Sequence, residues 1–229
     1  MIRTGRIKNF IWRGAGQVVG RDRVNKIILK RNFAFYKRAG IVFVHIPKCA
    51  GSSVSEVLYG RSLGHWPAAH LKNYNGDLFD DLDSFAVIRD PVLRARSAWS
   101  YCRVGGTKEG WIESRAEYKD PSFVSFDRFA TEWLPKKNLA DLDPVFRSQT
   151  SFVTGANEEL LVDRLVSVDD LHQWFMEVSK DIANVNSLPR KNLNLNNIDE
   201  LVSNEARDAI ENIYRCDVDL LSNYQGIHI

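Results

Sequence analysis

Several features are scarce in this chain of 229 residues, and each absence excludes a class of protein. It has only three cysteines, Cys49, Cys102 and Cys216. An odd number at wide spacing fits neither a disulfide framework nor a zinc site. No apolar run approaches the length of a membrane-spanning helix, and the first residues lack the long hydrophobic core of a secretion signal. We therefore expect one compact protein in the reducing environment of the cytoplasm.

The chain also lacks the common triphosphate-binding loop, G-x-x-x-x-G-K-[ST], in which the lysine follows the last glycine. Residues 41–53, IVFVHIPKCAGSS, instead join an apolar strand pattern to a loop in which Lys48 precedes Gly51. A helix is predicted to begin at Ser52 and Ser53, and its positive end favours an anion. The glycine lets the backbone approach closely, and the lysine adds charge. This segment therefore predicts a phosphate cradle.

A second segment, residues 85–101, repeats the pattern of an apolar strand followed by a helix. Arg89, at the expected strand end, can offer its planar guanidinium to a phosphate, and Ser97 can donate to the same group. Pro91 suits the first turn of the helix, and we expect Asp90 to cap that helix. An isolated R-D-P is more often a turn with a surface ion pair, so the argument depends on both segments occurring together.

The two segments together resemble the carbohydrate sulfotransferases that use 3′-phosphoadenosine 5′-phosphosulfate (PAPS), a group that includes heparan sulfate 2-O and 6-O and chondroitin sulfotransferases. P-K-x-A-G-[ST]-[ST] is similar to the family's 5′-phosphosulfate loop, and R-[ND]-P-x-x-R-x-x-S-x-[YW] to its 3′-phosphate motif. Weaker likenesses follow in order at residues 162–171, 188–192 and 213–224. The resemblance, to a small bacterial-like member, implies an α/β three-layer fold like that of P-loop-containing nucleoside triphosphate hydrolases. Such a fold has a central parallel sheet flanked by helices.

The resemblance also implies a reaction and a set of site residues. A sulfuryl group would pass from PAPS to an acceptor hydroxyl by in-line displacement, leaving 3′,5′-adenosine bisphosphate (PAP). Lys48 would be catalytic because it would stabilise the charge that develops on the departing phosphate. No metal ion is required. The implied donor-binding residues are Lys48, Cys49, Ala50, Gly51, Ser52, Ser53, Arg89 and Ser97.

A histidine is the natural base near neutral pH, and the chain has five. His45, His172 and His228 lie in the first strand, in a predicted late helix and in the tail. His65 and His70 lie between the two phosphate segments, in GHWPAAHLKNY. The family has a pattern similar to H-x-x-A-x-x-[LI]-[RK] at this point, and His65 occupies its leading position. We therefore predict His65 as the general base, with His70 in reserve.

Positive charge is concentrated at the N-terminus. Residues 1–38 contain eleven Lys or Arg and one acidic residue, whereas the remainder has 20 basic and 28 acidic residues, a formal charge of −8. We divide the chain into a basic extension, residues 1–38, packed on the core, and a single sulfotransferase domain, residues 39–229. The extension is a candidate for peripheral contact with the inner surface of a membrane or with an anionic acceptor. No nucleic-acid-binding module is recognisable.

The acceptor and the wider function class stay open at this point. The motif style favours a carbohydrate hydroxyl, and a glycolipid or another small-molecule hydroxyl is the alternative. Trp66, Trp99, Trp111 and Trp133 are candidate stacking surfaces for sugars, unless they belong to the core. The rival functions are a nucleotide or small-molecule kinase with an atypical loop, and a non-catalytic protein that keeps the PAPS-binding fold.

Helical spacing completes the sequence-based picture. It predicts helices over residues 123–134 and 169–182, and one long final helix over residues 204–223. The glycines of residues 105–110 predict a loop.

Overall fold

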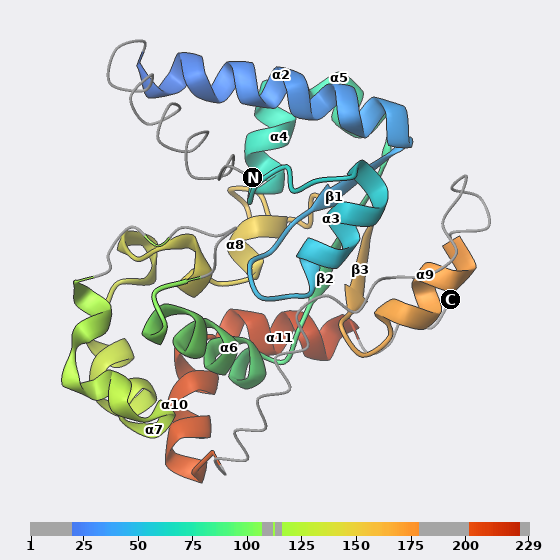
Figure 1. Cartoon of the computed structure of the whole chain (residues 1–229). Helices are drawn as coiled ribbons and strands as arrows, with labels where there is room; N and C mark the ends of the chain where they lie inside the picture. The colour runs from blue at the N-terminus through green and yellow to red at the C-terminus, as the bar shows by residue number, and fades with distance from the viewer. Residues whose placement is uncertain (1–19, 107–111, 113–115, 179–201, 225–229) are drawn as a thin grey trace, which may run out of the picture.

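The computed structural model describes residues 20–106, 112, 116–178 and 202–224, with mixed α/β architecture (Figure 1). Three parallel strands form a sheet in the order β1–β2–β3, flanked by helices. The strands are β1 (Ile41–Val44), β2 (Asp83–Ile88) and β3 (Arg164–Ser167). Their carboxyl ends lie at one edge of the sheet, because all three run in the same direction. The α/β prediction with a parallel sheet is therefore confirmed.

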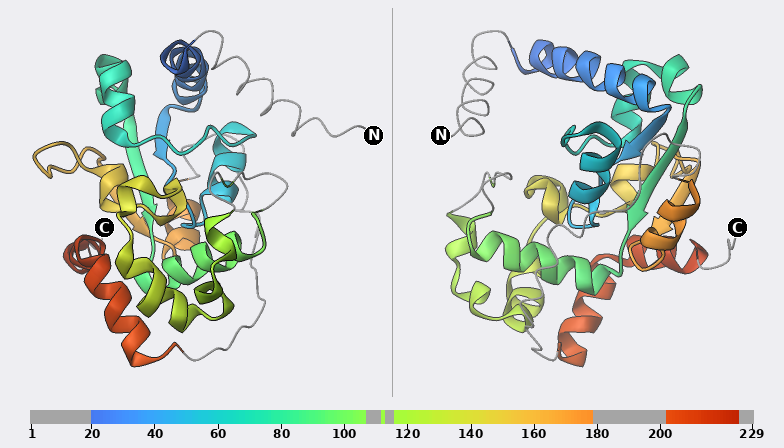
Figure 2. Two further views of the ribbon diagram at one scale, coloured as in Figure 1. Left: turned by 90° about the vertical axis from the view of Figure 1, so that its left-hand side faces the viewer. Right: turned by 45° about the vertical axis from the view of Figure 1, so that its right-hand side comes forward.

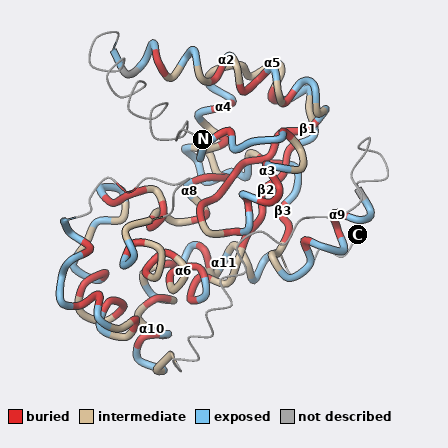
Figure 3. Tube along the Cα trace, in the orientation of Figure 1, coloured by how far each residue is buried: buried red, intermediate tan, exposed pale blue. Residues whose placement is uncertain are grey.

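Short β-branched and aromatic runs form these strands because both faces of a parallel sheet are covered. Every residue of β1 is buried, as are all residues of β2 after Asp83. Figure 3 shows buried residues along the three strands, and these belong to one of two core clusters. Within the described part of the chain β1 pairs with β2 alone, so the backbone groups on its other edge need other partners. Tyr59 supplies them, because its hydroxyl accepts from Phe43 N at 2.8 Å and donates to Ile41 O at 3.0 Å.

Two helices flank β1 in the chain. Helix α2 (Arg21–Ala39) ends at Gly40, whose left-handed backbone turns directly into β1. Its apolar side joins the core through Leu29, Phe33 and Tyr36. Helix α3 (Gly51–Tyr59) follows the loop after β1.

Four more helices connect or follow the strands in the chain. Helices α4 (Ala68–Tyr74) and α5 (Gly76–Asp80) precede β2, and α6 (Pro91–Arg103) follows it. Asp90 caps α6 by accepting from Leu93 N at 2.8 Å, and Pro91 is the first helical residue. Both predictions for the start of this helix are confirmed. Helix α9 (Leu171–Val178) follows β3. Of the helix predicted for residues 169–182, Asp169 and Asp170 form a turn before α9, and residues 179–182 lie outside the described residues.

A second core cluster lies beside the sheet and is built from short segments. The helix predicted for residues 123–134 is interrupted at Ser125, whose backbone is extended (φ −134°, ψ 157°), and helical turns of changing type then run from Phe126 to Lys136. Ser125 accepts from Arg128 N at 3.3 Å to start a new turn, and Pro135 stands near its end. The elements described between α6 and β3 are η1 (Glu117–Lys119), η2 (Pro121–Val124), α7 (Phe126–Arg128), the π-helical η3 (Phe129–Trp133), η4 (Leu134–Lys136), η5 (Leu139–Asp141), η6 (Pro144–Phe146) and α8 (Thr150–Val153).

The predicted single C-terminal helix is wrong. It is divided into α10 (Asn204–Ile213) and α11 (Arg215–Tyr224), which lie at a clear angle to each other (Figure 2). The break is at Tyr214, with φ −104° and ψ 36°. The phenol of Tyr214 donates to Phe146 O at 2.6 Å, and Asp217 is buried one turn later. These two inward-facing polar groups hold the bend in place.

Two of the four tryptophans proposed as sugar-stacking surfaces belong to the core. Trp99 and Trp133 are buried among aromatic side chains of the second cluster, so this part of the prediction is wrong. Trp66 is partly buried, and Trp111 lies outside the described residues.

Candidate functional site

The loop between β1 and α3 has an unusual backbone. Lys48 and Ala50 both have positive φ, 70° and 57°, a region that non-glycine residues rarely occupy. Left-handed residues that alternate with ordinary ones turn successive N–H groups towards one point, which forms a concave anion site. The loop leads into α3 without a side-chain cap at Ala50. Backbone N–H groups at the start of this helix are therefore available to an anion.

The ring of His45 explains the glycine in this loop. Gly51 is buried, and a Cβ at this position would lie 2.0 Å from Cδ2 of His45 and 2.3 Å from its Nε2. His45 is itself buried, and its Nδ1 has no hydrogen-bond partner. Burial lowers its pKa well below the usual value. A neutral His45 therefore packs on the glycine and fills the space under the loop.

We expect Gly51→Ala to destabilise the protein by about 1–3 kcal/mol, since the added methyl forces the buried His45 ring to move. Chemical denaturation measures this loss. Gly76→Ala is the matched control, because a Cβ at Gly76 would have no atom within 4 Å. Equal stability of the two variants would contradict the packing described for His45.

His65 contacts His45 in two ways. Its Nδ1 lies 2.9 Å from the carbonyl oxygen of His45, and the two rings are 4.1 Å apart between centroids. A carbonyl oxygen only accepts, so Nδ1 carries the proton and Nε2 keeps a free lone pair. The residue is solvent-exposed, yet protein packed on its inner side lowers the pKa of His65. The positive charges of Lys48 and Arg94 act in the same direction, against the His45 hydrogen bond.

Lys48 lies over an aromatic ring. Its Nζ is 4.2 Å from the ring centroid of Tyr101, a residue of α6. Partial burial is the main cause that lowers the pKa of Lys48 to about 8, and the charge of Arg89 adds to it. Tyr101 stabilises the ammonium by a cation–π contact. The side chain is held close to the loop from which it comes.

Arg89 connects the end of β2 to the same loop. Its Nη1 donates to the carbonyl oxygen of Lys48 at 3.4 Å, and the side chain is partly exposed. The backbone of Arg89 is fixed by Gln149, whose Oε1 accepts from Arg89 N at 2.9 Å and whose Nε2 donates to Arg89 O at 2.8 Å. The same Oε1 also accepts from the thiol of Cys49 at 3.2 Å. One buried amide thus joins both predicted phosphate segments.

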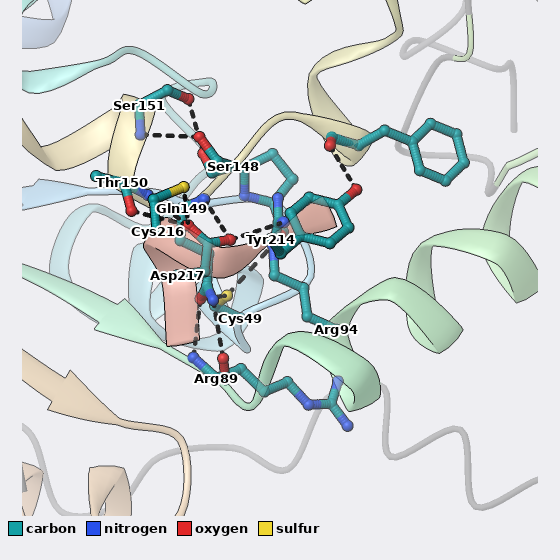
Figure 4. A network of polar contacts seen from close by, with 12 residues as sticks. Cys49, Arg89, Arg94, Ser148, Gln149, Thr150, Ser151, Tyr214, Cys216 and Asp217 are labelled. Carbon is teal, nitrogen blue, oxygen red and sulfur yellow. Dashed lines mark hydrogen bonds and ion pairs between the residues drawn. The ribbon is translucent and has the colours of Figure 1, made fainter. Parts of the chain in front are cut away.

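A second layer of polar contacts holds Gln149 (Figure 4). Asp217, at the start of α11, accepts from Gln149 N at 2.9 Å and from Thr150 N and Oγ1 at 2.9 Å each. It also lies 4.0 Å from Nη1 of Arg94, and both side chains of this ion pair are buried. Arg94 Nε donates to Pro47 O at 3.1 Å. The network therefore anchors the backbone of the loop after β1 to α6 and α11.

Three residues of this network were not predicted from the sequence as site residues: Arg94, Gln149 and Asp217. Arg94 stands inside the second motif, but it contacts backbone oxygens rather than the space in front of the loop. Gln149 and Asp217 lie 60 and 128 residues after Arg89, and no local pattern around them indicates their partners. Their roles depend on tertiary contacts alone.

The predicted residues fall into two groups in the structure. Lys48, Cys49, Arg89 and His65 lie at the carboxyl ends of β1 and β2. Arg89 donates to Lys48 O, Cys49 and Arg89 N share the Oε1 acceptor of Gln149, and His65 bonds the carbonyl oxygen of His45, the residue after β1. The thiol of Cys49 faces inwards, and burial raises its pKa to about 11, so it remains protonated. Only its backbone can face an anion.

The other predicted residues lie around this group. Ser52 is exposed and Ser53 is buried in the first turn of α3, and Ser97 is partly buried in the second turn of α6. The reserve base, His70, is exposed on α4 beside Trp66, with ring centroids 6.0 Å apart.

Comparisons with known proteins add no family assignment. No family model, curated protein or solved structure matches the chain. Among the described residues, no cluster of three His, Cys, Asp or Glu side chains could hold a metal ion, and no helix is long and apolar enough to cross a membrane. The segment predicted at residues 188–192 lies outside the described residues.

Proposed function

We propose that this protein is a PAPS-dependent sulfotransferase with a P-loop-like three-layer fold. The acceptor is a hydroxyl group of a carbohydrate, a glycolipid or another small molecule. One observation carries the proposal: a left-handed loop with Lys48, the guanidinium of Arg89 and a neutral imidazole at His65 meet at the ends of two adjacent parallel strands. Ligands of open α/β sheets bind at this edge.

The residues present suit the two anionic ends of the donor. The N–H groups of the loop and of the start of α3, from Cys49 to Ser52, suit the 5′-phosphosulfate, together with Lys48. The N–H of Ser53, which was included in the predicted set, already donates to Ala50 O at 3.2 Å. Arg89 and Ser97, which follow β2, suit the 3′-phosphate. A site that reads the 3′-phosphate discriminates against ATP, because Arg89 would lose its anionic partner.

The tautomer of His65 supports its role as the base. With Nδ1 donating to His45 O, Nε2 can accept the proton of the acceptor hydroxyl as its oxygen bonds to sulfur. The bond from sulfur to the phosphate oxygen breaks, and PAP departs with that electron pair. Lys48 stabilises the negative charge on this oxygen. Protons and charge balance without any further reactant.

The lowered pKa values of His65 and Lys48 predict how the activity depends on pH. His65 acts while neutral, above a pKa that lies below the usual 6.5, whereas Lys48 acts while protonated, below about 8. We expect kcat/KM, which reports the free enzyme, to fall below the lowered pKa of His65 and again above about pH 8. In Lys48→Arg the alkaline limb should move upwards, since guanidinium stays protonated. An alkaline limb unchanged by this substitution would remove Lys48 as its origin.

Transfer of labelled sulfuryl from PAPS tests the proposal. The purified protein is incubated with PAPS labelled with radioactive sulfur and a panel of neutral and acidic saccharides, glycolipids and phenols. We expect a labelled acceptor from the wild type and none from Lys48→Ala. Transfer of the γ-phosphate of ATP to the same panel would instead assign the protein to the kinases. Binding of PAP without transfer to any acceptor would favour the non-catalytic alternative.

A further inference from the structure

The exposed side of α2 has a feature that the proposed reaction does not use. At 100° per residue, the exposed side chains between residues 23 and 38 fall within about 120° of the helix circumference. Five of them are cationic, none is acidic, and the other two are Ile27 and Ala34. The opposite side of the helix is buried in the core. We call this stripe the basic face of α2, and it consists of Arg23, Lys26, Ile27, Lys30, Ala34, Lys37 and Arg38.

The cations of the basic face are not neutralised within the described part of the protein. None of the five is in an ion pair there, although exposed cations on other elements do pair, as Lys72 does with Asp80 at 2.8 Å. Asp22, at the border of the face, is the one acidic residue of α2. The guanidinium of Arg38 lies over the ring of Phe35, 5.1 Å from its centroid. The face therefore presents five positive charges over about 22 Å of helix.

The position of α2 decides which anion fits. The helix lies along one margin of the molecule, beyond the amino ends of the strands (Figures 1 and 2). The site residues lie at the carboxyl ends of β1 and β2. A bound acceptor chain would have to reach those residues from the far end of the sheet. A straight, exposed ridge with an apolar side chain at Ile27, 55% exposed, instead suits a flat anionic surface.

Charge asymmetry orients such an encounter. The remainder of the chain after residue 38 is acidic, with a formal charge of −8, so it is repelled by an anionic surface while α2 is attracted. Salt at 0.1 M screens both the attraction and the repulsion beyond about 10 Å. The face that lies nearest the membrane therefore determines the net electrostatic force.

We propose that the basic face of α2 docks this protein on membranes that contain anionic lipids, with the site at the far end of the sheet left free. The occupant is the layer of lipid headgroups, and the attraction is electrostatic with a small apolar contribution from Ile27. This proposal does not depend on the proposed sulfuryl transfer, because it involves no residue of that site.

Vesicle sedimentation of the full chain tests the docking. The protein should sediment with vesicles of phosphatidylcholine mixed with phosphatidylglycerol, remain in solution with phosphatidylcholine alone, and be released by high salt. The triple variant Arg23→Gln, Lys30→Gln and Lys37→Gln should bind about 100-fold more weakly, at about fivefold for each cation near the surface. Its thermal stability should match that of the wild type, since all three side chains are exposed.

A control with the same change in net charge separates this face from general positive charge. Lys119→Gln, Lys136→Gln and Arg207→Gln are exposed substitutions on η1, η4 and α10, and together they should leave vesicle binding unchanged. Equal binding by both triple variants, or no sedimentation of the wild type, would overturn the proposal. Retention on immobilised heparin without vesicle binding would assign the face to an anionic polysaccharide and would also overturn it.

Discussion

Asp217→Ala is expected to destabilise the protein by about 3–5 kcal/mol, because it leaves the buried guanidinium of Arg94 without its carboxylate. The substitution also removes the acceptor of Gln149 N, Thr150 N and the Thr150 hydroxyl. For a chain of this size the loss corresponds to a fall in Tm of about 10 °C. Chemical denaturation and calorimetry measure the two quantities. Binding of PAP should also weaken, since Asp217 fixes Gln149, and Gln149 in turn bonds Arg89 and Cys49.

The control for this prediction lies two residues along the same helix. Asp219 is exposed and forms an ion pair with Arg215 at 3.3 Å. Asp219→Ala should change the stability by no more than about 1 kcal/mol, as is usual for a surface pair. A similar loss in both variants would mean that the buried network does not contribute as described. An unchanged Tm in Asp217→Ala would contradict it directly.

His65→Ala is expected to lower sulfuryl transfer by about 10²- to 10⁴-fold, the usual contribution of a positioned base. The binding of PAP should change little, because the proposed phosphate contacts come from the loop, Arg89 and Ser97. Isothermal calorimetry with PAP and the labelled transfer assay report the two properties separately. A variant that loses binding and transfer together would instead indicate that His65 supports the loop through His45.

His70→Ala is the matched control for the base. His70 lies five residues later, exposed on α4, and has no contact with His45 among those described for the site. We expect it to transfer sulfuryl at the wild-type rate. Loss of transfer in His70→Ala with normal transfer in His65→Ala would exchange the roles of the two histidines.

The parts of the fold that the sequence predicted are those coded by neighbouring residues. The strand and loop around Lys48 follow from a local run of apolar and small residues, and α3 begins at Gly51, one residue before the predicted start. Asp90 caps α6 as expected because a cap is formed three residues away from its partner. These signals need no knowledge of tertiary structure.

The parts that were missed depend on distant backbone groups. Gln149 binds the main chain of Arg89, and Asp217 binds the main chain of Gln149 and Thr150. Any residue type could supply these backbone groups, so the sequence holds no complementary side chain that would indicate the contact. The bend at Tyr214 was missed for the same reason, since its phenol bonds to Phe146 O. The apolar periodicity of residues 204–223 continues through Tyr214 and therefore predicts one helix. The hydrogen bond from Tyr214 to Phe146 O holds a bend there, which divides the segment into α10 and α11.

The role of His45 shows how a buried residue can shape a site without taking part in chemistry. The sequence pattern indicates only that it belongs to the first strand. The structure places its ring against Gly51 and its carbonyl oxygen on His65. A glycine after a lysine in such a loop can therefore reflect the packing of a ring as well as the approach of a phosphate.

The edge of the sheet next to Lys48 and Arg89 is the proposed binding site of a nucleotide with a 3′-phosphate. The most direct test is the thermal shift of the purified protein with PAP, compared with ADP and with ATP plus magnesium, because a ligand of the native state raises the apparent stability. We predict a clear rise in Tm with PAP, little change with the other two, and a smaller rise in Arg89→Ala. A rise only with ATP and magnesium, or no rise with any of the three, would contradict the account.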